Sequence, residues 1–182
     1  MKPIKPGVEF WGPDPKMAAI KRKAAKIMYQ INQAPPEKRE KICREFIPKL
    51  FKSVGEHTFF EIPFNCDFGC FTEIGSNCYF NHHFSIGDSG QVKIGDFVLV
   101  GPYVGLYTAQ HPLDSQKRKA NLQTVQPITI GNNVWIGANC TILGGVTIGD
   151  NVVIGAGSVV TRNIPSNSLA YGVPCRVRKT LK

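Results

Sequence analysis

The sequence predicts a mainly β solenoid with a helical segment in front of it. Apolar residues recur every six positions from residue 62 onward, and glycine follows most of them. Glycine and proline number 18 and 13 of the 182 residues, about one residue in six where average usage is about one in eight, so the fold contains many turns. The length fits one domain, or one domain with a small appendage.

The N-terminal part of the chain, residues 1–55, is predicted to be helical. Its apolar residues recur at spacings of three and four, as one face of an amphipathic helix requires: Met17, Ile20, Ala24, Ile27 and Ile31. This helix is expected to end near Asn32. A second, shorter helix is expected from Pro36, because proline fits a first helical turn, and Pro48 is expected to bend or end it.

A six-residue period follows the helical one. Fourteen positions lead the repeats, and all of them are apolar: Ile62, Phe68, Ile74, Phe80, Ile86, Ile94, Val100, Leu106, Ile130, Ile136, Ile142, Ile148, Ile154 and Val160. The fifth position of most repeats is also small or apolar, and it includes three cysteines: Cys66, Cys78, Val98, Val104, Val134, Cys140, Val146 and Val152. Short strands that each point one apolar residue inward stack as a solenoid.

Glycine marks the position after the leading residue. It occurs there in nine repeats: Gly69, Gly75, Gly87, Gly95, Gly101, Gly131, Gly137, Gly149 and Gly155. The expected reason is that glycine adopts backbone angles closed to other residues, which allows the chain to turn.

Composition excludes several classes of protein. No apolar run approaches the roughly 18 residues of a transmembrane helix, and the first ten residues lack the apolar core of a secretory signal, so a cytoplasmic location is expected. The six cysteines contain no C-x-x-C pair and are expected to be buried thiols rather than a disulfide framework.

Charge is unevenly distributed. Residues 1–55 carry a net +8, residues 56–160 a net −4 and residues 161–182 a net +5, which together give the +9 of the chain. Basic ends suggest a polyanionic partner such as nucleic acid, an anionic membrane or a phosphorylated ligand. No nucleic-acid motif accompanies the basic stretches, so neither nucleic acid nor a membrane is the expected partner.

The repeat is interrupted twice. The spacing from Ile86 to Ile94 is eight residues, and a longer excursion leaves the repeat between Leu106 and Ile130. Excursions from a regular scaffold are favoured places for function. His111 lies in the longer one; a loop histidine before proline is by itself more often solvated than catalytic. Asn81 replaces a repeat glycine, which equally fits an asparagine ladder or a left-handed turn.

Residues 56–182 resemble the hexapeptide-repeat acyltransferases. The runs Tyr107-Thr-Ala-Gln-His-Pro-Leu-Asp114, PITIGNNVWIGANCTILGGVTIGDNVVIGAGSVVT (127–161) and GVPCRV (172–177) are similar to the maltose, galactoside and nodulation-factor O-acetyltransferases. The resemblance implies a left-handed parallel β-helix over residues 56–165, with a loop excursion at 107–127 and a C-terminal extension at 166–182. The left hand comes from the family, because general rules favour a right-handed coil.

The resemblance also implies a reaction, the transfer of an acetyl group from acetyl-CoA to a hydroxyl of a sugar or similar small molecule. A base must take the hydroxyl proton, and imidazole titrates near neutral pH, so His111 is the expected general base. Asn81 is expected beside the thioester, and the backbone N–H of Ala138 is a candidate oxyanion donor. No metal is required.

Other residues are assigned by their matches to family positions. The cofactor-binding candidates are Asn81, Trp135, Ala138, Ala156, Thr161, Arg162, Arg176 and Lys179. Ordinary wall packing remains an alternative for Trp135. The substrate-binding candidates are Asp14, Asp67 and Ser89, although the family often has an acidic residue where Ser89 stands. Adjacent residues on an extended strand point to opposite faces, so only one of His82 and His83 is expected in the acceptor cleft.

The family forms homotrimers with active sites between subunits, which is the expected assembly here. Three alternatives remain. The first is an acetyltransferase for a xenobiotic or amino-acid hydroxyl. The second is a non-catalytic binding solenoid. The third, a zinc carbonic anhydrase on the same fold, is disfavoured because the four histidines lack the usual ligand spacing.

Overall fold

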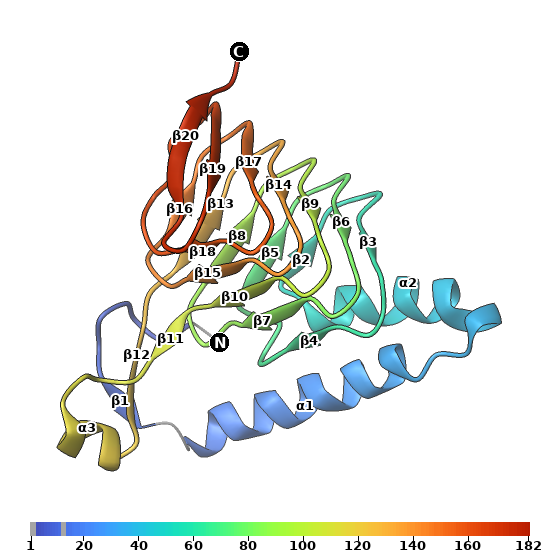
Figure 1. Ribbon diagram of the computed structural model, residues 1–182. Coiled ribbons are helices and arrows are strands. Elements are labelled where there is room, and N and C mark those ends of the chain that lie inside the picture. The colour runs from blue at the N-terminus through green and yellow to red at the C-terminus, as the bar shows by residue number, and fades with distance from the viewer. Residues whose placement is uncertain (1–2, 12–13) are drawn as a thin grey trace.

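The computed structural model describes residues 3–11 and 14–182, which form a three-sided stack of parallel strands with helices lying across its first end (Figure 1). The predicted fold class, a mainly β parallel β-helix with an N-terminal helical segment, is confirmed. The chain visits the three sides in turn, so strands that are one coil apart lie next to each other in a sheet.

Each side of the stack is one sheet, named here I, II and III in the order in which the chain visits them. Sheet I contains β2 (Ser53–Val54), β5 (Thr72–Ile74), β8 (Val92–Ile94), β13 (Ile128–Ile130) and β16 (Thr147–Ile148). Sheet II contains β3 (Phe59–Phe60), β6 (Tyr79–Phe80), β9 (Leu99–Val100), β14 (Trp135–Ile136), β17 (Val152–Ile154), β19 (Ser168–Tyr171) and the antiparallel β20 (Arg176–Thr180). Sheet III contains β4 (Asn65–Cys66), β7 (Ser85–Gly87), β10 (Gly105–Tyr107), β15 (Thr141–Leu143) and β18 (Val159–Val160).

The core follows the predicted register. Of the fourteen leading residues only Ile62 is half-buried, and the other thirteen are buried. The fifth positions are buried as well, including Cys66, Cys78 and Cys140. All six cysteines are free thiols, of which only Cys70 is half-buried. The buried-thiol prediction is therefore confirmed for five of the six.

The reason expected for the repeat glycines is wrong. Among the nine, only Gly69 has a positive φ. The left-handed conformation instead falls two residues later in the repeat, at Asn77, Asn133 and Asn151 for example. The repeat glycines are needed because the coils approach closely: a Cβ on Gly75 would lie 2.6 Å from the backbone of Gly95 in the next coil. Glycine here allows close stacking rather than a turn.

The helical prediction holds with one correction. Helix α1 spans Pro15–Asn32, as predicted, and is followed by a 3-10 turn, η1 (Pro36–Lys38), and helix α2 (Arg39–Leu50). Pro48 lies inside α2 and does not end it, because Phe51 N–H still donates to the Ile47 carbonyl at 3.2 Å. Helix α1 packs against β4 and α2 against β2, so both cover the first coil.

The long excursion between sheets III and I has its own structure. Strand β11 (Ala109–Gln110) and strand β12 (Leu122–Val125) form an antiparallel pair, with helix α3 (Ser115–Lys119) between them. The N-terminal strand β1 (Phe10–Trp11) pairs with β12 on its other edge. This three-stranded sheet projects from the side of the solenoid (Figure 1).

Candidate active site

Strand register aligns three candidate residues along one edge of the solenoid. Phe80, Val100, Ile136 and Ile154 pair in succession in sheet II. The residues that follow them therefore stack at the corner where the chain passes to sheet III, called here corner II/III. Asn81 lies there on the second coil, and Ala138 and Ala156 lie above it on later coils.

The orientation of the Asn81 side chain is fixed by one hydrogen bond. Its Oδ1 accepts from the backbone N–H of His82 at 2.8 Å, so the amide NH₂ remains available as a donor. Asn81 has no positive φ and belongs to no asparagine ladder. The ladder is elsewhere, where Asn151 Nδ2 donates to Asn167 Oδ1 at 2.8 Å and Asn133 Nδ2 donates to Asn151 Oδ1. Both structural alternatives for Asn81 are therefore wrong.

His82 and His83 do not lie on an extended strand. They form the turn after Asn81, with His83 at φ 60°. The ring of His83 stacks on Tyr103 of the next coil at a centroid distance of 4.7 Å, and His82 meets the same ring edge-on at 5.5 Å. The two histidines therefore share one aromatic neighbour rather than facing opposite ways.

His111 lies on the excursion, at the corner between sheets III and I, called here corner III/I. Its Nδ1 is 3.0 Å from the carbonyl oxygen of Leu122 on β12. A carbonyl can only accept, so this contact places the ring proton on Nδ1 and leaves the lone pair on Nε2. His111 is exposed, and Nε2 is free to act as a base.

The turn that carries His111 is braced by side chains that sequence reasoning missed. The guanidinium of Arg118 donates to the carbonyls of Pro112 and Leu113 at 3.0 and 2.9 Å. Lys117 forms an ion pair with Glu9 at 2.7 Å, which ties α3 to the N-terminal arm. No local pattern signals this ion pair, because Glu9 and Lys117 are 108 residues apart.

A cavity of about 260 Å³ lies next to the base of the excursion. Its walls come from the N-terminal arm, helix α1, two successive coils and the excursion: Phe10, Met17, Ala18, Lys21, Asp67, Phe68, Ser89, Ala109 and Gln123. Asp67 forms an ion pair with Lys21 at 2.6 Å, and Ser89, which lines the same cavity, is buried. The structure thus brings together two of the three predicted substrate residues.

The third substrate candidate, Asp14, has a structural role in this chain. Its Oδ1 accepts from the backbone N–H groups of Lys16 and Met17 at 2.7 and 3.0 Å, which caps the N-terminus of α1. Asp14 does not line the cavity described above. A contact between Asp14 and substrate stays a prediction.

The remaining cofactor candidates are exposed and lie at separate places. Thr161 and Arg162 follow β18 at corner III/I. Arg176 and Lys179 lie on β20, paired with β19 at the C-terminal end of sheet II. Trp135 points outward from sheet II with 55% of its surface exposed, so ordinary wall packing does not account for it.

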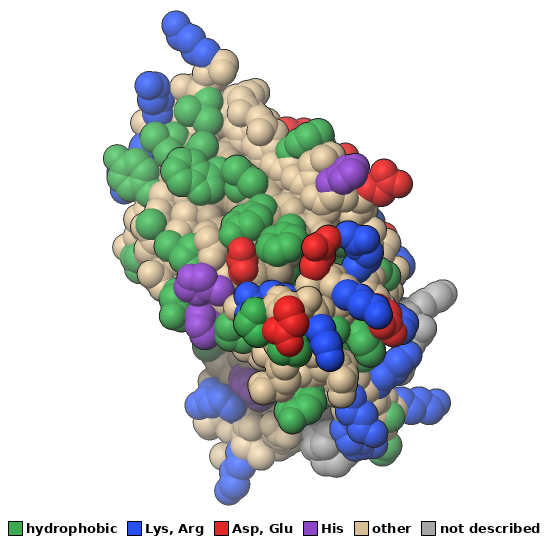
Figure 2. All heavy atoms as spheres, turned by 90° about the vertical axis from the view of Figure 1, so that its right-hand side faces the viewer, with side chains coloured by type: hydrophobic (Ala, Val, Ile, Leu, Met, Phe, Trp, Pro, Cys, Tyr) green, Lys and Arg blue, Asp and Glu red, His purple; other side chains and the backbone are tan. Residues whose placement is uncertain are grey.

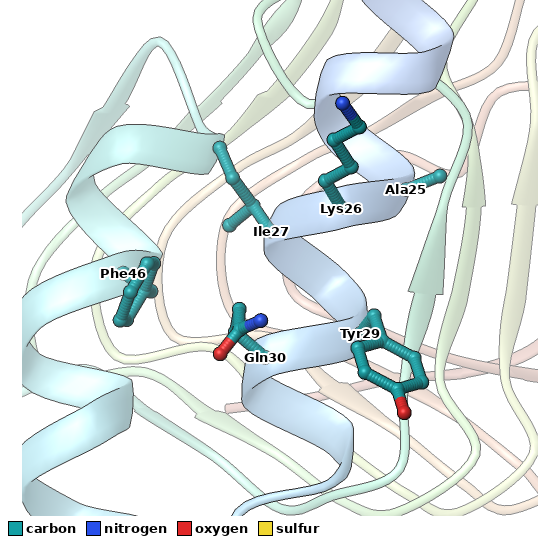
Figure 3. Close-up of a pocket in the computed structure, with 6 residues that line it drawn as sticks. All are labelled: Ala25, Lys26, Ile27, Tyr29, Gln30 and Phe46. Carbon is teal, nitrogen blue, oxygen red and sulfur yellow. The ribbon is translucent and has the colours of Figure 1, made fainter.

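Other hollows lie away from the candidate site residues. One of about 470 Å³, between α2 and the first coil, includes Glu40, Cys43 and His57 in its lining. A shallow groove of about 460 Å³ lies between α1 and α2, where Ile27 and Gln30 point toward Phe46 (Figure 3).

Within residues 3–11 and 14–182, no helix is both long and apolar enough to cross a membrane. Within the same residues, no three His, Cys, Asp or Glu side chains are grouped as metal ligands.

Comparison with known proteins identifies the family. The family described as bacterial transferase hexapeptide (six repeats) matches residues 127–162. Galactoside O-acetyltransferase of Escherichia coli is 47% identical over 154 residues, which cover 83% of this chain and 74% of that protein. The chain belongs to the hexapeptide-repeat acetyltransferase family. A putative acetyltransferase of Saccharomyces cerevisiae is 42% identical over 90% of this hexapeptide-repeat acetyltransferase and 83% of its own length.

Solved structures support the same assignment. A maltose O-acetyltransferase from Clostridium difficile 630 superposes with a TM-score of 0.91 at 40% identity, covering 97% of this hexapeptide-repeat acetyltransferase and 94% of that chain. A galactoside acetyltransferase in complex with coenzyme A also has a TM-score of 0.91, at 42% identity over 97% and 88% of the two chains. The enzyme class predicted from the sequence, an acyltransferase, is confirmed.

Proposed function

We propose that this enzyme transfers an acetyl group from acetyl-CoA to a hydroxyl of a sugar or a similar small molecule. The observation that carries the proposal is His111, whose Nδ1 is occupied by the Leu122 carbonyl and whose Nε2 is free. Gln123 and Ala109, from the two strands that flank His111, line the cavity with Asp67 and Ser89. The names of the relatives, galactoside and maltose O-acetyltransferases, support this acceptor class.

The reaction needs few groups from the protein. His111 Nε2 removes the proton of the acceptor hydroxyl while that oxygen bonds to the carbonyl carbon of the thioester. The carbon–sulfur bond then breaks, and His111 returns its proton to the departing sulfur. The Ala138 N–H is the donor proposed for the carbonyl oxygen. The Asn81 amide NH₂, which lies two coils below and is available because Oδ1 is already engaged, is proposed to contact the thioester. Acetyl-CoA supplies the activated acyl group.

The residues at corner II/III suit the long arm of acetyl-CoA. Glycine and alanine occupy most of the ridge above Asn81: Gly101, Gly137, Ala138, Gly155 and Ala156. The larger residues on it are Pro102 on the third coil and Tyr171 at the upper end. From β6 to β19 the ridge rises by four strand spacings, about 19 Å. Arg176 and Lys179 at its upper end supply positive charge for the phosphates.

The position of His111 supports a site shared between copies of the chain. Asn81 precedes β7 by four residues, and His111 follows β10 by four residues in the same sheet. Asn81 and His111 therefore lie at opposite ends of the strands of sheet III, at corner II/III and corner III/I. If corner II/III of one copy faces corner III/I of the next, Asn81 of one copy meets His111 of its neighbour, and each copy takes part in two sites. Such a head-to-tail contact closes into a ring, and we propose the homotrimer.

An exposed apolar band on sheet II supports self-association. Phe59, Tyr79, Leu99 and Trp135 pair in register across four neighbouring strands and point outward. Three of them expose between 43% and 55% of their surface. Hydrophobic side chains gather on this face of the molecule (Figure 2). Large exposed apolar patches are typical of interaction surfaces.

An acceptor panel tests the activity. Thiol release from acetyl-CoA is followed with galactosides, maltose, glucose, an amino sugar, serine and a xenobiotic alcohol, each against a reaction without acceptor. We expect release to depend on a sugar hydroxyl, with the acetyl ester identified by mass spectrometry. Release equal to the no-acceptor rate for every compound would overturn the proposal and favour a binding solenoid.

Mixing two inactive variants tests the shared site. If His111 and Asn81 meet between copies, a mixture of His111→Ala and Asn81→Ala chains that is unfolded and refolded together regains activity. With random equal mixing, about a quarter of the sites contain both intact residues. Separately refolded chains that are mixed afterwards are the control. No recovery in the co-refolded sample would place both residues in one chain.

The cytoplasmic location and the absence of a required metal stay predictions.

A further inference from the structure

One fully buried carboxylate has no part in the chemistry proposed above. Asp88 lies in the short interruption of the repeat, directly after β7, and its exposure is 0%. Within residues 3–11 and 14–182 it forms no ion pair with lysine, arginine or histidine. A buried carboxylate without a cationic partner is costly, which calls for a reason beyond packing.

Both oxygens of Asp88 accept hydrogen bonds from the preceding coil. Oδ1 accepts from the backbone N–H of Phe68 at 2.8 Å, and Oδ2 accepts from the Thr72 hydroxyl at 2.9 Å. Both partners are donors in this arrangement. An asparagine would turn its NH₂ toward one of them, so only a carboxylate accepts from both in this geometry.

These two bonds connect the predicted acceptor residues. Asp67 immediately precedes Phe68, and Ser89 immediately follows Asp88. Both line the 260 Å³ cavity, from two successive coils. On the other side of the interruption, Thr108 Oγ1 accepts from Gly90 N–H at 2.9 Å and donates to the Gly87 carbonyl at 2.6 Å. Thr108 lies at the root of the excursion that carries His111.

We propose that Asp88 is a positioning residue of the acceptor cavity, which fixes Asp67 and Ser89 relative to each other by bridging Phe68 N–H and the Thr72 hydroxyl. This inference rests on the function proposed above. Asp88 contacts neither the cavity nor the reacting atoms, so its effect is on acceptor binding and not on the binding of acetyl-CoA.

The surroundings of Asp88 define how it responds to pH. The charged or titratable groups on the segments that pack against it are Asp67, which is paired with Lys21, and the thiols of Cys66 and Cys70. Burial raises the pKa of both thiols, so they are neutral near pH 7. Burial likewise raises the pKa of Asp88 to about 6. Below that pH the protonated oxygen becomes a donor, so the Thr72 hydroxyl no longer donates to it and the geometry of the bridge changes.

Substitutions at Thr72 test the bridge without removing Asp88. Thr72→Val deletes the hydroxyl and keeps the side-chain shape, whereas Thr72→Ser keeps the hydroxyl. Ser168→Ala removes another buried hydroxyl, which donates to the Ser166 carbonyl far from the cavity, and controls for a general loss of buried hydrogen bonds. The acceptor is the best sugar from the panel above, and KM is measured separately for acceptor and acetyl-CoA.

We expect Thr72→Val to raise the acceptor KM by about 3- to 10-fold, the equivalent of one hydrogen bond, with the KM for acetyl-CoA unchanged. Thr72→Ser and Ser168→Ala keep the wild-type acceptor KM. In the wild type the acceptor KM rises as pH falls through about 6, and Asp88→Asn removes this dependence.

The outcomes separate this inference from the function on which it rests. Wild-type acetyl transfer with equal acceptor KM in Thr72→Val and Thr72→Ser overturns the positioning role alone. Equal increases in the KM values for acceptor and acetyl-CoA also overturn it, because they indicate general damage. No acetyl transfer by the wild type overturns the proposed function, and the positioning role with it.

Discussion

The two corners of sheet III are built in different ways. At corner II/III, Asn81, Ala138 and Ala156 are placed by the strand register, and each coil repeats the backbone of the coil below. At corner III/I, the repeat breaks, and the position of His111 is fixed by contacts within the excursion, from the Leu122 carbonyl to its ring and from the Arg118 side chain to the following Pro112. The residues proposed to bind acetyl-CoA at corner II/III therefore depend on backbone stacking, whereas the proposed acceptor side depends on individual side chains.

This difference predicts that the two corners tolerate substitution differently. Changes at corner II/III disturb coil stacking and therefore stability together with acetyl-CoA binding. Changes in the excursion at corner III/I leave the stack intact and alter catalysis or the choice of acceptor, whereas Asp88, which is buried at the same corner, also affects stability. Four substitutions test this contrast.

The largest effect is expected at His111. His111→Ala removes the proposed base, so kcat falls by about 10²- to 10⁴-fold, while acetyl-CoA still binds because none of its candidate residues lies on the excursion. Turnover is followed by thiol release, and acetyl-CoA binding by calorimetry. The matched control is His57→Ala, which changes an exposed histidine near the first strands and leaves kcat unchanged. Wild-type turnover in His111→Ala would contradict the assignment.

The next effect concerns Asp88 and pH. Burial raises its pKa from 3.8 to about 6, so the folded state binds the proton more tightly than the unfolded state. The stability that this group contributes is complete below pH 4 and is lost as pH rises through 6, a change of about 3 kcal/mol. The free energy of unfolding of the wild type, compared with Asp88→Asn, is measured in urea at pH 4 and pH 8. A difference between the two proteins that is the same at both pH values would contradict the prediction.

A smaller effect is expected at the stacked glycines. A Cβ on Gly137 would lie 2.6 Å from the backbone nitrogen of Ala156, so Gly137→Ala forces the coils apart at corner II/III and costs about 2 kcal/mol. Gly131→Ala produces a similar clash, with Gly149, at the corner between sheets I and II. Both variants lower the melting temperature, but only Gly137→Ala raises the KM for acetyl-CoA. Equal KM values in the two variants would remove corner II/III from the acetyl-CoA site.

The smallest effect is expected at the ion pair between Glu9 and Lys117. Both groups are exposed to solvent, which weakens the pair, so Glu9→Gln lowers kcat/KM for the acceptor by only about 2- to 5-fold. Glu45→Gln breaks an exposed pair with Lys49 on α2 and is the matched control. Exchanging the charges in the double variant Glu9→Lys, Lys117→Glu restores the rate. An equal loss in Glu9→Gln and Glu45→Gln would mean that the N-terminal arm does not support His111.

Local periodicity explains what the sequence predicts well. The burial of the leading residues and the bounds of α1 follow from spacings of six and of three to four residues, which depend only on near neighbours. The reason for the repeat glycines, which is close stacking of the coils, is not predicted from local spacing, because it depends on the next coil, about eighteen residues away. The pairing of β1 with β12 joins residues more than one hundred positions apart and leaves no periodic signal.

The candidate site divides in the same way. Asn81, Ala138 and Ala156 lie where the repeat register places them. Their roles, which the family resemblance implies, stay predictions. The burial of Asp88 is not predicted from the sequence, because an aspartate in an interruption of the repeat resembles an exposed turn residue. Only the structure reveals that its side chain is enclosed by the Phe68–Thr72 segment.

The number of stacked coils also sets the length of the ridge at corner II/III. Each coil adds about 4.8 Å to the ridge, in a fixed direction and with the same backbone. The distance from Asn81 to the charged end at Arg176 is therefore set by the number of coils between them, not by any side chain. In the binding mode proposed for acetyl-CoA, a chain with one more coil between β9 and β14 would hold the sites for the thioester and the phosphates one strand spacing further apart. The length of donor that fits this proposed site would then depend on the number of coils, which insertions of whole coils change and point substitutions do not.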